Sequence, residues 1–230
     1  MCSSDLWGFS TLLLTYYVHV LGISGGLVGA ALAIALVFDA ITDLTVGSWS
    51  DNFRSKYGRR HPFMLAAIIP LPICFFLLFW PPLSLSSLAL FIWLTTFTIL
   101  TRTALTFFHV PYLALGAELT KNYHERTTLV MIRTGMGYLS SLLVVVVAFS
   151  FFFVSSEAVP KPHLTRDPYF EFAIISALTM TIMMLASIWG TRGTIKHLSG
   201  TDEARKPFQP SRIYLDLLEA MKNNSFRALI

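Results

Sequence analysis

Residues 27–50 read LVGAALAIALVFDAITDLTVGSWS, and this stretch decides the class of fold. A bilayer-spanning helix needs about 20 mostly apolar residues, and the stretch provides that length. Two further runs, 142–154 and 172–190, contain no basic residue. Over the whole chain 13% of residues are charged and 54% are hydrophobic, whereas about a quarter of the residues in a soluble domain are charged. The sequence therefore predicts an all-α membrane protein.

Six spans follow from the apolar runs and the polar stretches between them: 7–21, 27–50, 63–80, 87–115, 129–154 and 170–190. We expect residues 1–190 to form a six-helix transmembrane bundle. Residues 191–230 are more polar and are expected to hold an amphipathic helix that begins near Pro210 and lies on the membrane surface. An apolar run begins at Phe226, so we expect the sequence to be cut as a seventh span starts. Six spans with a polar central loop are typical of half of a twelve-span transporter.

Basic residues are unequally divided between the two ends of the bundle. The opposite end carries Lys161 and Arg166, whereas the loops after spans two, four and six carry Arg54, Lys56, Arg59, Arg60, Lys121, Arg126, Arg192, Lys196, Arg205, Lys206 and Arg212. Since cytoplasmic loops are enriched in Lys and Arg, both ends of the chain are predicted to be cytoplasmic, in a bacterial-type inner membrane. The same rule accounts for the basic pI of about 9.2, so no nucleic-acid partner is expected.

Charged residues inside the spans carry the functional information, because each costs roughly 2.5–3.5 kcal/mol at a helix centre. Asp39 and Asp43 are four residues apart and share one face of span two. Two carboxylates at that spacing suit a bound cation, Na⁺ or H⁺, and Thr42 could add an oxygen ligand. Alternatively, the carboxylates pair with Arg133 or Arg102 to hold the bundle together. The sequence does not decide whether Arg102 faces a cavity or pairs locally.

The same face of span two continues through Gly47 to Asp51 at four-residue steps. Gly47 permits close helix approach. Asp51 lies beside Arg59 and Arg60, and an ion pair there could latch two helix ends in one conformation. Within spans one and four, His19 and His109 could be polar residues satisfied between helices or could serve a function.

The segment Gly47-Ser-Trp-Ser-Asp51, followed by Arg54-Ser-Lys-Tyr-Gly58-Arg59-Arg60, resembles the loop motif of the major facilitator superfamily. Preceded by Asp39-Ala-Ile-Thr-Asp43, it resembles the glycoside–pentoside–hexuronide:cation symporter family. Similarity extends from the first hairpin to span five, through Val110-Pro-Tyr112, Glu118, Glu125-Arg126 and Arg133.

The resemblance implies a twelve-helix fold that works by alternating access. It implies a coupling-cation site at Asp39, Asp43, Thr42 and Thr106, with Na⁺ possible at the two carboxylates. It also implies a substrate pocket that includes Arg133, His109, His19 and Tyr112. A cytoplasmic gate is implied at Gly47, Asp51, Arg54, Gly58, Arg59, Arg60, Glu118 and Arg126. No cofactor is implied beyond the coupling ion.

The expected function is cation-coupled symport of a sugar or glycoside, with substrate contacts completed by a C-terminal half. Departures from the family pattern keep a non-sugar substrate, anionic or lipid-like, open: His109 stands where the family's sugar pocket has an acidic residue, and Leu113 where it has an aromatic one. A non-transporting membrane scaffold is a further alternative. An enzyme is disfavoured, because the six histidines are scattered and no His-x-x-His or Gly-x-Ser-x-Gly pattern occurs.

Overall fold

The computed structural model describes residues 11–53, 55, 58–82, 84–118, 122–153 and 164–194, without the side chains of 117, 118 and 194. All regular structure within these ranges is helical, which confirms the predicted all-α class. The helix Thr11–Val20 ends in a π-helical turn, η1 (Tyr16–Val20). The others are α2 (Gly25–Asn52), α3 (His61–Ala67), α4 (Pro70–Phe79), α5 (Ser87–Glu118), α6 (Tyr123–Val147) with η2 (Ala148–Phe152), and α7 (Asp167–Thr191) with η4 (Arg192–Thr194). The expected amphipathic helix near Pro210 lies outside the described residues.

Five helical segments in the described ranges are long and apolar enough to cross a membrane: Gly25–Asn52, His61–Phe79, Ser87–Gly116, Tyr123–Phe152 and Asp167–Thr191. They coincide with predicted spans two to six, which confirms those spans and moves their ends by a few residues. The first predicted span begins at Trp7, outside the described residues, and its described part is the shorter apolar helix Thr11–Val20.

Span three is not one continuous helix, because two prolines interrupt its backbone hydrogen bonding. Pro70 and Pro72 have no N–H, so they cannot donate to the carbonyl groups four residues earlier. The chain turns at Ile68 and Ile69 and divides the span into α3 and α4. Pro111, in contrast, lies within the continuous helix α5.

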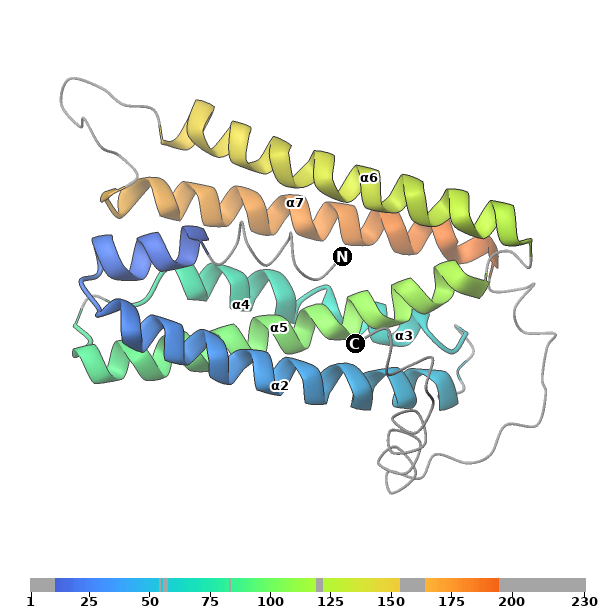
Figure 1. Ribbon diagram of the computed structural model, residues 1–230, viewed down its shortest axis with the longest axis horizontal. Coiled ribbons are helices and arrows are strands. Elements are labelled where there is room, and N and C mark those ends of the chain that lie inside the picture. Colours follow the sequence, from blue (N-terminus) through green and yellow to red (C-terminus); the bar gives the residue numbers. More distant parts are fainter. Residues whose placement is uncertain are drawn as a thin grey trace, which may run out of the picture.

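The helices α2, α3 and α4 all pack against α5, while α7 packs against α3 and α4. Figure 1 shows α2 and α5 ending, and α6 beginning, at one end of the bundle, on the right. Helix α6 has no buried side chain along its length, although η2 at its far end packs against α7. Helix α5 is therefore the packing partner that α2, α3 and α4 share.

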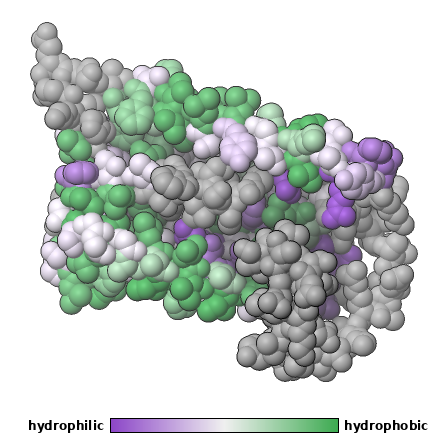
Figure 2. All heavy atoms as spheres, in the orientation of Figure 1, coloured by the Kyte–Doolittle hydropathy of each residue, from purple (hydrophilic) through white to green (hydrophobic). Residues whose placement is uncertain are grey.

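The surface of the bundle is apolar along its flank. Large exposed side chains include Val37, Ile41, Met131 and Leu142. In Figure 2 hydrophobic residues dominate the flank of the helices, and hydrophilic residues gather at the right end. A contiguous apolar surface of this kind is typical of contact with lipid or with other helices.

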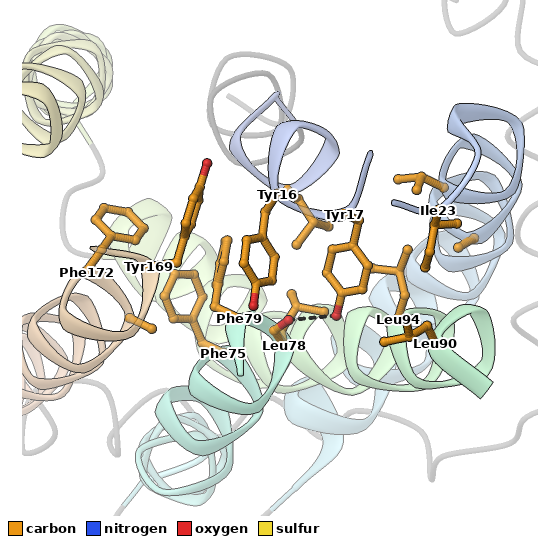
Figure 3. Packing of buried hydrophobic residues seen from close by; sticks show 14 of the residues in the cluster. Tyr16, Tyr17, Ile23, Phe75, Leu78, Phe79, Leu90, Leu94, Tyr169 and Phe172 are labelled. Atoms are coloured by element: carbon orange, nitrogen blue, oxygen red, sulfur yellow. Dashed lines mark hydrogen bonds between the residues drawn. The ribbon is translucent and has the colours of Figure 1, made fainter. Parts of the chain in front are cut away.

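A cluster of aromatic side chains joins the helices at the other end of the bundle (Figure 3). Tyr16 and Tyr17, next to each other in the chain, are fully buried within it. The cluster also includes Phe75, Leu78, Phe79, Leu90, Leu94, Phe153, Tyr169 and Phe172. The hydroxyl of Tyr17 donates a 2.7 Å hydrogen bond to the carbonyl oxygen of Leu78. The first helix is thereby fixed to α4, α5 and α7.

Candidate cation-coupling site

Two neighbouring helices, α2 and α5, position the charged groups of the predicted cation site. Asp39 lies near the midpoint of α2, and Arg102 lies near the midpoint of α5. The two helices pass in van der Waals contact, since a Cβ atom at Gly47 would lie 3.5 Å from Cγ1 of Val110. A Cβ atom would thus meet Val110 at an ordinary contact distance, and the expectation that position 47 needs glycine for close approach stays a prediction. The packing of α2 against α5 brings the middle of α5 beside the two carboxylates.

Asp39, Asp43, Arg102 and Thr106 form one hydrogen-bonded group between α2 and α5. Nη1 of Arg102 lies 2.8 Å from Oδ2 of Asp39. The hydroxyl of Thr106 lies 2.8 Å from Oδ1 of Asp43 and 3.4 Å from Oδ1 of Asp39. Because a hydroxyl carries one proton, the shorter contact to Asp43 takes most of the hydrogen bonding. Thr106 thus links the two carboxylates.

The ion pair between Asp39 and Arg102 is largely shielded from solvent, with side-chain exposures of 15% and 9%. The sequence left Arg102 and Arg133 open as partners of the carboxylates, and in the structure Arg102 pairs with Asp39. Arg133 forms no ion pair with either carboxylate within the described part of the chain. With all groups ionised, Asp39, Asp43 and Arg102 carry a net charge of −1. Asp43 also lies within electrostatic range of His109.

The sequence offered Arg102 and Arg133 as alternative partners of the carboxylates and did not decide between them. The available signal was spacing, because Arg102 and Thr106 are four residues apart on one helix face. Thr42, in contrast, directs its hydroxyl proton to its own helix, where it donates a 2.9 Å bond to the carbonyl oxygen of Asp39. The hydroxyl oxygen of Thr42 still has its own lone pairs to offer, and its assignment as a cation ligand stays a prediction.

The predicted substrate residues are distributed over three helices. His109 and Tyr112 follow Thr106 on α5 at three-residue steps, and both are half-buried. The Tyr112 ring stacks on Phe108. Arg133, on α6, is half-buried, and its Nε atom has no hydrogen-bond partner among the described residues. His19 is exposed in η1. The roles of these four residues in substrate binding stay predictions.

The predicted ion pair at the end of span two is present. Nη2 of Arg60 lies 3.1 Å from Oδ1 of Asp51, with Arg60 7% exposed and Asp51 47% exposed. Gly58 has φ = 84°, a left-handed conformation that favours glycine. Next to Arg60, the Nε2 atom of His61 lies 3.2 Å from the hydroxyl oxygen of Thr191 at the end of α7. The start of α3 is therefore tied to both α2 and α7.

The structure shows less about the remaining residues of the predicted gate. Arg59 is half-buried, and Arg126 is exposed in the first turn of α6. Glu118 ends α5, but its side chain is not described, and Arg54 lies outside the described residues. A role for these residues in gating stays a prediction.

The similarity of this chain to known proteins covers most of its length and is not limited to the candidate site. A family model described as MFS/sugar transport protein matches residues 6–230. The chain is 34% identical over 125 residues to a putative glycoside/cation symporter of Escherichia coli, with 54% of this chain and 27% of the relative covered. It is 29% identical over 147 residues to an isoprimeverose transporter of Lactiplantibacillus pentosus, covering 64% of this chain and 30% of that protein.

An animal protein is also similar. Over 98 residues the chain is 36% identical to a sodium-dependent lysophosphatidylcholine symporter of Danio rerio, covering 41% of this chain and 18% of the relative. In each of the three comparisons the matched part of the chain spans less than a third of the relative's length. The model match over nearly all of the sequence, together with the helical bundle and its paired membrane carboxylates, shows that the chain belongs to the MFS/sugar transport protein family.

Proposed function

We propose that the whole protein containing this chain is a secondary active symporter that couples entry of a monovalent cation to uptake of a sugar or glycoside. The observation that carries the proposal is the group formed by Asp39, Asp43, Arg102 and Thr106 in the middle of two spans. A net negative charge at that depth is costly, and a mobile cation removes the cost. The names of the bacterial relatives support a carbohydrate substrate.

The coupling follows from linkage between the two ligands. A cation bound at Asp43 cancels the net charge, so the loaded site can be enclosed by protein at lower cost than the empty one. If the cation also orders the polar face of α5 next to the site, each ligand raises the affinity for the other by the same factor. His109 and Tyr112 lie on that part of α5 and would provide substrate contacts.

We propose that the bundle lies in the inner membrane with the Arg60–Asp51 end in the cytoplasm. The positive-inside rule supports this orientation, because Arg59, Arg60 and Arg192 lie at that end. The ion pair between Arg60 and Asp51 would then hold the cytoplasmic ends of α2 and α3 together in one state of the cycle.

The test is uptake by the full-length protein in proteoliposomes. Isoprimeverose and a β-glucuronide serve as probes, with an inward gradient of Na⁺ or of H⁺. We expect one gradient to drive accumulation, and Asp43→Asn to abolish accumulation while retaining exchange of probe without a gradient. Thr106→Val removes the hydroxyl that donates to the ionised Asp43, so it should tighten proton binding up to about tenfold, whereas for Na⁺ it removes a ligand oxygen and should weaken binding. Thr106→Ser should preserve the wild-type affinity. Asp167→Asn, at the exposed start of α7, is the matched carboxylate control.

Unchanged uphill uptake by Asp43→Asn would refute the assigned coupling site. A second candidate substrate class is an amphiphile with a charged headgroup, favoured by the similarity to the lysophosphatidylcholine symporter. Uptake of lysophosphatidylcholine, with neither carbohydrate probe accumulated, would replace the sugar proposal by this one.

A further inference from the structure

The ion pair between Arg102 and Asp39 gives the candidate site a fixed positive charge. Two carboxylates alone would carry a charge of −2, and two positive charges would be needed to cancel it. The guanidinium of Arg102 lies 2.8 Å from Asp39 and supplies the first of these charges from within the chain. The charge left over is a single one, and geometry puts it on Asp43, whose Oδ1 atom accepts from Thr106 rather than from a cationic group.

Stabilisation of the bundle does not account for this ion pair well. Replacement of a buried ion pair by apolar residues of similar volume is often neutral or stabilising. The pair is also made through one hydrogen bond, from Nη1 to Oδ2, and the Nε atom of Arg102 is buried without a hydrogen-bond partner in the described residues. A forked contact through two nitrogen atoms would hold a carboxylate more firmly. The observed contact is therefore one that can open during a transport cycle.

We propose that Arg102 is a tethered counter-ion of the coupling site: it neutralises Asp39, so that one monovalent cation per cycle is accepted, at Asp43. The inference rests on the proposed function for its meaning in transport. Its basis is the geometry of four side chains: Arg102 occupies an oxygen of Asp39, and Thr106 joins that carboxylate to Asp43. Arg102 is thus a specificity-determining residue that fixes how many cations the site takes.

A second cation bound between the carboxylates would lie a few ångströms from the guanidinium. Repulsion between two positive charges at that distance is strong in a partly buried site. Arg102 therefore competes with the mobile cation at Asp39 and leaves Asp43 accessible to it. The same argument holds whether the cation is Na⁺ or H⁺, and the experiment distinguishes the two.

Cation binding to the purified full-length protein tests the proposal without any sugar. Na⁺ binding is measured by titration calorimetry, and proton uptake on acidification is measured with a pH-indicator dye. We expect one Na⁺ per wild-type protein or, for H⁺, one proton more than the Asp43→Asn variant takes up. Arg102→Gln should bind a second cation and tighten the apparent affinity at least about tenfold. Arg102→Lys keeps the positive charge and should retain the wild-type stoichiometry.

Removal of Asp39 gives the most discriminating comparison. In Asp39→Asn the guanidinium has lost its carboxylate and should turn to Asp43, so we expect cation affinity to fall at least about tenfold. In the double variant Asp39→Asn/Arg102→Gln both charges of the pair are absent. Asp43 then stays as the one carboxylate of the group, and we expect a single cation to bind with nearly wild-type affinity.

Three outcomes would overturn the inference: a double variant as defective as Asp39→Asn, a wild-type stoichiometry in Arg102→Gln, or two cations bound by the wild-type protein. If Arg102→Gln fails to fold by size-exclusion chromatography, the Arg102→Lys and double variants still decide. If the wild-type protein and its variants bind cations as expected but no gradient drives uptake of any probe, the symport proposal is refuted and the inference about Arg102 is not. Gradient-driven uptake by a wild-type protein that binds two cations would refute the inference about Arg102 and leave the symport proposal standing.

Discussion

The guanidinium carbon of Arg166 lies 4.0 Å from the centre of the Trp80 ring, so the start of α7 is stacked on the end of α4. Nη2 of the same guanidinium donates to the carbonyl oxygen of Pro81. These two contacts join segments that are far apart in the sequence, beside the aromatic cluster. They give a basic residue at the less basic end of the bundle a structural role.

Arg166→Ala should therefore lower the free energy of unfolding by about 1–2 kcal/mol, from a lost cation–π contact and a lost hydrogen bond. Arg166→Lys should lose part of this, because an ammonium group stacks less well than a planar guanidinium. Thermal unfolding of the purified protein measures the effect. Arg192→Ala, at the exposed end of α7, is the control and should change little. Equal effects of the Arg166→Ala and Arg192→Ala variants would contradict a specific role for the stacking.

Tyr16 and Tyr17 offer a matched comparison of two buried hydroxyl groups. Tyr17 donates to the carbonyl oxygen of Leu78, whereas the hydroxyl of Tyr16 has the Arg166 guanidinium nearby but makes no contact of hydrogen-bond geometry in the described structure. Tyr17→Phe should cost about 1–2 kcal/mol of stability, since it leaves a buried carbonyl group short of a donor. Tyr16→Phe should cost less than about 0.5 kcal/mol. The same thermal unfolding assay decides, and a larger loss in Tyr16→Phe would show that the hydrogen-bond assignment is wrong.

The Arg60–Asp51 pair should contribute modestly to stability. Asp51→Asn removes one charge-assisted acceptor from the buried Arg60, but Asp51 is 47% exposed, so solvent screening limits the loss to about 1 kcal/mol. Asp51→Glu should retain most of the stability. Chemical unfolding of the two variants measures the difference. A loss several times larger in Asp51→Asn would mean that the residue holds more of the bundle end than this one pair.

Opposite ends of the bundle should differ in access from outside the cell. In a background with Cys2 and Cys74 changed to Ser, a cysteine at the exposed position Ser86 should react with a membrane-impermeant maleimide in intact cells. A cysteine at Ser55 should react after permeabilisation. These sites lie before α5 and after α2, at the two ends of the bundle. The reverse labelling pattern would overturn the proposed orientation.

Span positions were predictable from the sequence because apolar runs of bilayer length leave few alternatives. The predicted range 27–50 became Gly25–Asn52, and 170–190 became Asp167–Thr191. Span three was predicted as one helix, and the interruption at Ile68 and Ile69 was missed. Its signal was present, since Pro70 and Pro72 each remove a backbone donor.

The site was predictable only in part. The spacing of Asp39 and Asp43 placed both on one helix face, and the resemblance added Thr106. The partner of Asp39 depended on the register between α2 and α5, which no local pattern determines. Arg102 and Arg133 were therefore equally available as partners in the sequence. The packing of α2 against α5 brings Arg102, rather than Arg133, to the carboxylate.

The interruption within span three also has a consequence for movement. Its two halves are attached to different ends of the bundle: α3 through Arg60 and His61, and α4 through Leu78 and Trp80. At the joint, two backbone donors are already missing, so a change of angle there sacrifices fewer hydrogen bonds than in an unbroken helix. One end of the bundle can consequently loosen while the aromatic packing at the other end stays intact. In the proposed transport cycle, such a joint would let the end of the bundle near Arg60 change its packing while the end near Trp80 stays closed.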